Sequence, residues 1–124
     1  MKFYAALIIP LLTACAGTAP MPPAEPGVMQ LQSQEALTPY IGRRLTRDNG
    51  DYVVMAADGT FAGVYSQTVT TGSYVMRDGF FCRVVTAGPS GPAPEDCQVV
   101  TVSDDKVTFV RERGTGAAVV YTMT

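Results

Sequence analysis

A β-hairpin followed by a cysteine is the feature that most constrains how this chain folds. Residues Gly72–Arg83 read GSYVMRDGFFCR, in which Tyr74 and Met76 fall on one face of an extended chain. Asp78–Gly79 supplies the positive φ values that a tight hairpin turn requires. The run Phe80–Thr86 is aromatic and β-branched, which is typical of a strand with much buried surface. The sequence therefore predicts two antiparallel strands joined at Asp78–Gly79.

Two cysteines are placed to tie this hairpin to the next strand. Cys82 lies inside the second strand of the hairpin, and Cys97 opens the apolar run Val99–Val102. The stretch 87–96 contains three prolines, which indicates a loop between them. We expect a Cys82–Cys97 disulfide, which stabilises the fold by about 3 kcal/mol in the chain-entropy model. The alternative is two unpaired buried cysteines, the rarer state in an exported protein.

The third cysteine follows a segment that has the features of a signal peptide. Met1–Lys2 is a short basic start, and Phe3–Leu12 is an apolar run too short to span a bilayer. Leu12–Cys15 resembles a bacterial lipobox, in which the cysteine is lipidated and becomes the mature N-terminus. We therefore expect a signal peptide at 1–14 and an acylated Cys15; the alternative is an ordinary secretory signal with Cys15 incidental.

A proline-rich stretch follows, and we expect residues 15–32 to be the acylated cysteine and an extended tether. This stretch has four prolines and no apolar periodicity, so it predicts a spacer of about 3 Å per residue. Several acyl chains on Cys15 give stable membrane anchoring, where a single chain does not. Ala16 follows the cysteine in place of an aspartate, which resembles lipoproteins sorted to the periplasmic face of the outer membrane.

The remaining residues, 33–124, predict one antiparallel β domain of about eight strands. Ser33 is a candidate N-cap for a short helix that turns Leu37 toward the core. Beyond Gly42, strand and turn signals alternate at short spacing, which favours a small meander closed or nearly closed into a barrel. The expected strands are 43–47, 52–56, 60–66, 72–77, 80–86, 97–102, 106–111 and 117–123, with 67–71 either a loop or more strand.

The alternation within these strands predicts which side chains fill the barrel. The core candidates are Phe61, Tyr65, Tyr74, Cys82, Val107, Phe109, Val119, Tyr121 and Met123. Gly63, inside a predicted strand, marks either a bulge or a barrel corner. A barrel this small is expected to be filled by side chains, with little room for a large ligand.

The residue types present predict no catalytic, metal-binding or cofactor-binding set. The chain has no histidine, which removes Ser-His-Asp and Cys-His mechanisms and the commonest zinc ligand. The acidic residues fall mostly in predicted turns, where turn chemistry explains them. The net charge of −2 does not suit nucleic-acid binding. The arginines form either a patch for an anionic partner or solvated strand faces; they are Arg43, Arg44, Arg47, Arg77, Arg83, Arg111 and Arg113.

Several short sequence pieces together resemble a known group of proteins. The pieces are, in order, Gly42–Leu45, Asp58–Gly63, Thr71–Tyr74, Gly79–Arg83, Cys97–Val100 and Phe109–Ala117. They resemble small exported alphaproteobacterial β-domain proteins of uncharacterised function, over about residues 36–124. The chain departs from that group at Tyr74, where tryptophan is more frequent, and in its lipobox and tether. The resemblance implies the fold and the exported location, and it implies no catalytic residues.

Some members of that group carry the name dihydrodipicolinate reductase, which does not suit this chain. Such an enzyme resembles a two-domain dinucleotide-binding protein, and this sequence has neither that length nor a G-x-G-x-x-G fingerprint. We expect a monomeric, non-enzymatic envelope lipoprotein that binds another protein or the cell wall, similar in architecture to periplasmic lysozyme inhibitors. The alternative is a carrier for a small apolar ligand or a lipid, which predicts an apolar cavity inside the barrel.

Overall fold

The computed structural model describes residues 27–124. The predicted signal peptide at 1–14, the predicted lipidation site Cys15 and most of the predicted tether lie outside the described residues. None of the helices in the described part of the chain is long and apolar enough to cross a bilayer.

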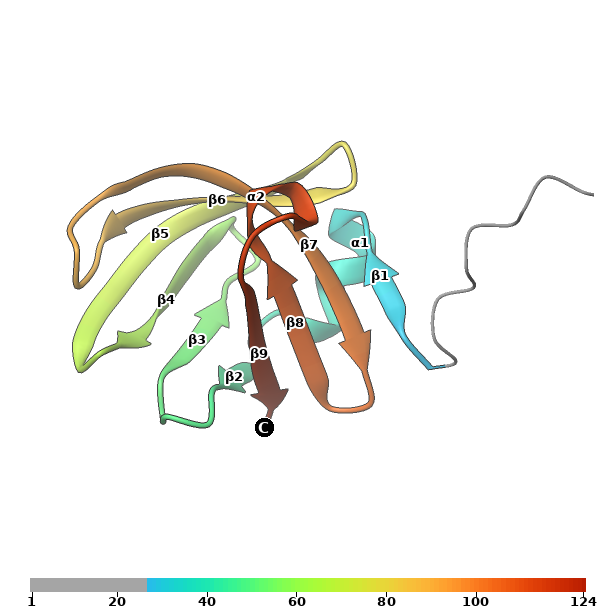
Figure 1. Cartoon of the computed structure of the whole chain (residues 1–124), viewed down its shortest axis with the longest axis horizontal. Helices are drawn as coiled ribbons and strands as arrows, with labels where there is room; N and C mark the ends of the chain where they lie inside the picture. Colours follow the sequence, from blue (N-terminus) through green and yellow to red (C-terminus); the bar gives the residue numbers. More distant parts are fainter. Residues whose placement is uncertain (1–26) are drawn as a thin grey trace, which may run out of the picture.

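The structure is an antiparallel β-barrel with short helical connections, as the sequence predicts (Figure 1). The strands are β1 Met29–Leu31, β2 Arg44–Thr46, β3 Tyr52–Met55, β4 Thr60–Tyr65, β5 Thr68–Arg77, β6 Phe80–Ala87, β7 Ala93–Ser103, β8 Lys106–Val110 and β9 Ala118–Met123. The helical elements are α1 Gln34–Leu37, the 3-10 turn η1 Thr38–Tyr40 and α2 Arg111–Gly114. Strands β2 to β9 close the barrel through the β7–β8 pairing, and β1 adds to β7.

The meander gives the barrel two different ends. The β2–β3, β4–β5, β6–β7 and β8–β9 connections all lie at one end, which we call the mouth. The other three turns and the α1–η1 segment lie at the opposite end, which we call the closed end. In Figure 1 the β4–β5 and β6–β7 connections of the mouth lie at the left, and α1 and β1 lie at the right.

Local signals explain the elements that were predicted correctly. Ser33 caps α1 by accepting a hydrogen bond from the Ala36 N–H at 3.1 Å, and Leu37 is fully buried. Asp78 and Gly79 have φ angles of 53° and 80°, so they form the tight turn between β5 and β6.

The core contains most of the side chains that the alternation predicts. Tyr74, Phe81, Phe109 and Tyr121 form a chain of aromatic contacts, with successive ring centroids 5.2, 5.2 and 5.5 Å apart. The predicted residues Phe61, Tyr74, Val107, Phe109 and Tyr121 are buried in it, and Tyr65, Val119 and Met123 are half-buried against it. Cys82 is also buried, but it lies outside this cluster. Because Phe81 points inward, its neighbour Cys82 points to the outer face.

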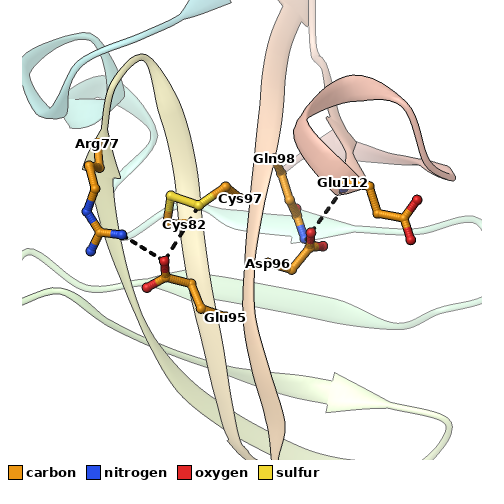
Figure 2. Close-up of a disulfide and its surroundings, with 7 residues drawn as sticks. All are labelled: Arg77, Cys82, Glu95, Asp96, Cys97, Gln98 and Glu112. Carbon is orange, nitrogen blue, oxygen red and sulfur yellow. Dashed lines mark hydrogen bonds and ion pairs between the residues drawn. A yellow bond between two sulfur atoms is a disulfide. The ribbon is translucent and has the colours of Figure 1, made fainter.

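The predicted disulfide is present. It joins Cys82 of β6 to Cys97 of β7, which are directly opposite each other in the strand register. Figure 2 shows Arg77 and Glu95 beside it, paired at 2.7 Å. A sulfur in a disulfide carries no proton, so the 3.7 Å approach of Cys97 Sγ to Glu95 is a contact and not a hydrogen bond.

The folded chain begins earlier than the sequence predicts. Residues up to Gln32 were expected to be tether, but Met29–Leu31 pairs with Val100–Val102 of β7. Strand β6 pairs with β7 only as far as Gln98, so this edge of β7 is open for β1. Leu31 is fully buried as a result. A strand of three residues is too short to show an apolar period, which is why the prediction was wrong.

The predicted loop at 87–96 is also shorter than expected. Strand β6 continues to Ala87 and β7 begins at Ala93, so only Gly88–Pro92 connects them. Pro94 is tolerated inside β7 because the β6–β7 register shifts there, between the Val85–Ala93 and Arg83–Asp96 pairs. A proline lacks the N–H that a regular ladder needs, and a bulge is one of the few places in a sheet where that loss is harmless.

The open choices at 67–71 and at Gly63 are settled. Ser66 and Gln67 have φ angles of 48° and 63° and form the β4–β5 turn, so Thr68–Thr71 is strand. Pairing between β3 and β4 is regular through Gly63, so there is no bulge. A Cβ at Gly63 would lie 2.0 Å from the Tyr52 carbonyl oxygen, so the glycine allows a close backbone approach.

Removing the disulfide should destabilise the barrel without changing its topology. The bridge closes a loop between residues 15 apart in sequence, so we expect Cys82→Ala/Cys97→Ala to lower the free energy of unfolding by about 3 kcal/mol. Urea unfolding followed by circular dichroism measures this, with wild type under reducing agent as the parallel case. A loss under 1 kcal/mol would contradict the expectation.

Candidate functional site

The barrel is filled at its closed end and hollow at its mouth. A cavity of about 270 Å³ extends inward from the β6–β7 connection to the rings of Phe61, Phe81 and Phe109. The expectation of a barrel filled throughout by side chains is therefore wrong for the mouth half. An apolar cavity of about 150 Å³ is large enough for benzene, and one water takes about 30 Å³. The cavity has room for a small ligand of roughly ten non-hydrogen atoms.

Two tyrosines place hydroxyl groups together in the wall of this cavity. Tyr65 of β4 and Tyr121 of β9 both line it, and their hydroxyl oxygens are 2.6 Å apart. One hydroxyl donates its proton to the other, and the accepting hydroxyl keeps its own proton. Among residues 27–124 no further acceptor lies within hydrogen-bond reach of that proton. The pair therefore presents one O–H donor.

Burial determines the protonation of this pair. Burial raises the pKa of the Tyr121 phenol, and the neighbouring Tyr65 raises it further. Arg47 and Arg83 act on the same pKa in the opposite direction, because a nearby cation favours the phenolate.

Three arginines line the cavity, and two of them have no ionic partner. Arg47 is 3.9 Å from Asp51, at the limit of an ion pair. Arg83 and Arg111 have no carboxylate within 4.0 Å in the described part of the chain. Arg83 lies between Phe81 and Val85 on the inward face of β6, where the alternation otherwise places apolar side chains. The cavity therefore combines apolar walls with a positive mouth.

Two carboxylates near the cavity, Asp51 and Asp96, accept hydrogen bonds from protein groups. Asp51 accepts hydrogen bonds from the Ser66 N–H at 3.1 Å and from Asn49 Nδ2 at 3.2 Å. Asp96 accepts one from Gln98 Nε2 at 2.9 Å and one from the Glu112 N–H at 3.0 Å (Figure 2). These hydrogen bonds hold the connections in place.

The connection between β8 and β9 is strained in a way that holds α2 at the mouth. Glu112 and Arg113 have φ angles of 52° and 56°, and Gly114 follows at 90°. Left-handed backbone costs about 1–2 kcal/mol for each non-glycine residue. The bond from the Glu112 N–H to Asp96 and a 2.7 Å bond from Thr115 Oγ1 to the Glu112 carbonyl offset part of that cost. Arg111, at the start of this turn, is thereby held beside the cavity.

The predicted arginine patch divides into groups with different roles. Arg44 lies over the Tyr52 ring at 3.6 Å, and Arg113 lies over the Phe80 ring at 5.1 Å. Arg77 pairs with Glu95 on the outer face. Arg43 is exposed and does not line the cavity, whereas Arg47, Arg83 and Arg111 do. The sequence contained one signal for this group: Arg83 shares the inward face of a strand with Phe81 and Val85.

Of the predicted cysteine sites, the structure describes only the disulfide, which lies away from the cavity. Cys15 is outside the described residues, and the Cys82–Cys97 disulfide is on the outer face of β6 and β7. Within residues 27–124, Cys82, Glu95 and Cys97 are close enough together to hold a metal ion. Both sulfurs are bonded to each other and Glu95 is paired with Arg77, so these groups do not form a metal site.

Comparison with known proteins finds no matching family model, no matching curated protein and no matching solved structure. The physical properties of the cavity are therefore the basis for assigning a function.

The buried tyrosine should make stability depend on alkaline pH. Unfolded Tyr121 ionises near its ordinary pKa of 10.0, whereas the folded protein holds the proton to higher pH. Because the folded pKa is raised, this contribution to stability is complete below about pH 10 and is lost as pH rises above it. We expect the urea midpoint of wild type to fall more steeply between about pH 9 and pH 11 than that of Tyr121→Phe. Tyr40→Phe, which removes a phenol that does not line the cavity, is the control; equal slopes for Tyr121→Phe and wild type would be evidence against the prediction.

Proposed function

We propose that this chain is a non-enzymatic envelope protein that binds a small, largely apolar ligand inside its barrel. The observation that carries the proposal is the cavity of about 270 Å³, walled by Phe61, Phe81 and Phe109 and reached from the mouth. Preformed apolar cavities with a few convergent polar groups are the usual form of small-ligand sites. The histidine-free sequence favours binding over turnover.

The sequence supports an exported, membrane-anchored form of this protein. The lipobox-like Leu12–Cys15 favours acylation of Cys15 and attachment to the membrane, most simply at the periplasmic face of the outer membrane. The Cys82–Cys97 disulfide suits an oxidising compartment, where such bonds persist. Recognition of another envelope protein or of the cell wall stays a prediction. The cavity supports binding of a small ligand more directly than it supports either of these.

The affinity of the cavity should follow the length of the ligand. Each buried methylene contributes about 0.8 kcal/mol, which is about a fourfold change in affinity. We expect the affinity for neutral 1-alkanols to rise about fourfold per carbon and to level off near ten non-hydrogen atoms, when the cavity is full. Calorimetric titration of the mature chain, produced without acylation, measures the series.

A variant with a blocked cavity is the control for this series. Val119 lines the cavity and is half-buried, so Val119→Trp should fill the space while the fold is retained. We expect the variant to keep the wild-type circular dichroism spectrum and to lose alkanol binding. The proposed function is wrong if the wild type binds none of the alkanols at millimolar concentration, or if the wild type and the variant bind them with equal affinity.

Anchoring is tested separately at the lipobox. Cys15→Ser removes the thiol that accepts the lipid, so we expect the protein to move from the membrane fraction to the soluble fraction and to lose incorporation of labelled palmitate. Ala14→Gly keeps a small residue before the cysteine and should leave both properties unchanged. A wild-type protein found in the soluble fraction would contradict the anchored form.

A further inference from the structure

The groups at the mouth narrow the class of ligand. We propose that the cavity binds an amphiphilic anion, with its oxyanion head held by Arg83 and the Tyr65–Tyr121 hydroxyl pair and its apolar tail directed toward the closed end. This inference rests on the proposed function and adds the chemistry of the head group.

The first step is the position of Arg83. It occupies an inward position of β6 and is half-buried, between the inward side chains of Phe81 and Val85. Taking a cation out of water is unfavourable unless an anion or hydrogen-bond acceptors receive it. Within residues 27–124 no carboxylate lies within 4.0 Å of Arg83. A ligand oxyanion would supply the missing partner.

The second step is the carboxylate that stands closest to Arg83 in the sheet. Asp96 is directly across from it in the β6–β7 register. The Asp96 oxygens instead accept hydrogen bonds from Gln98 Nε2 and the Glu112 N–H, 2.9 and 3.0 Å away. These bonds hold the Asp96 carboxylate against α2, and it forms no ion pair with Arg83. The guanidinium group of Arg83 is therefore available to a ligand.

The third step is the set of groups that accompany Arg83 in the cavity. The Tyr65–Tyr121 pair keeps one hydroxyl proton without an acceptor among the described residues. Arg47 and Arg111 line the same cavity, so three arginines and one phenolic donor contribute to its wall. Donors that converge in this way select an acceptor with negative charge. A neutral alcohol offers such a site one weak acceptor, and an ammonium group offers none.

The fourth step is size and direction. The polar groups belong to the mouth half of the barrel, and the rings of Phe61, Phe81 and Phe109 form the inner wall. A head at the arginines and a tail against these rings would occupy about ten non-hydrogen atoms in all. An eight-carbon acid such as octanoate has that size.

Four ligands of equal chain length test the head group. We expect octanoate or octyl phosphate to bind the mature, non-acylated chain at least about tenfold more tightly than 1-octanol, and octylammonium to bind more weakly than 1-octanol. The stronger of the two anions identifies the head as a carboxylate or a phosphate. Calorimetric titration at neutral pH and low salt measures all four.

Three variants test the residues. Arg83→Gln should weaken the preferred anion about tenfold and change 1-octanol less than about twofold. Arg77→Gln removes the same charge from the outer face and should change neither. Tyr65→Phe, which removes a half-buried hydroxyl without touching any arginine, should weaken the anion by about threefold to tenfold. If Arg83→Gln does not fold, the Tyr65→Phe variant still tests the proposed head-group site.

The outcomes separate this inference from the proposed function. If 1-octanol or octylammonium binds as tightly as both anions, the anionic head is ruled out while ligand binding in the barrel stands. If Arg83→Gln and Arg77→Gln weaken binding of the anion equally, the effect comes from the net charge of the protein, and the proposed head-group site is wrong. If none of the four ligands binds, the proposed function itself fails.

Discussion

Pairing of β7 with β8 is the constraint on which the rest of the molecule depends. Strand β7 is eleven residues long and pairs with β6 and β1 along one edge and with β8 along the other. This pairing converts an open meander into a closed barrel and leaves no long exposed edge. Once the barrel is closed, every residue faces either its inside or its outside, and a register slip of one residue would exchange the two sets. The faces to which Phe81, Cys82 and Arg83 point follow from the alternation along β6 and from its register with β7.

The two faces of β6 and β7 show how the register separates structural from binding chemistry. Outside, the disulfide joins β6 to β7, and beside it Arg77 of β5 forms an ion pair with Glu95 of β7. Inside, Arg83 and Gln98 share the cavity wall with aromatic rings. Residues that are adjacent in the sequence of β6 or β7, such as Cys82 and Arg83, therefore lie on opposite faces of the barrel wall. Changes to the bracing groups and to the cavity groups can be separated experimentally because they do not share contacts.

Local sequence patterns were sufficient to predict most strands and turns, whereas predicting the cavity would have required the long-range geometry of the barrel. The turn at Asp78–Gly79 could be predicted because it depends on two neighbouring residues. The Cys82–Cys97 disulfide could be predicted because cysteines of an exported protein are expected to be oxidised. Strand β1 was missed because three residues carry no period, and the start of β7 was missed because Pro94 usually excludes a strand. The cavity was missed because its volume depends on how side chains from seven strands, β3 to β9, meet, which no single segment of the sequence specifies.

The direction of β1 has a consequence for how a bound molecule would leave. Met29 pairs with Val102, near the β7–β8 turn, so the chain joins the barrel at the end opposite the mouth. A molecule that leaves the cavity through the mouth would therefore move away from the end of the barrel at which β1 joins it.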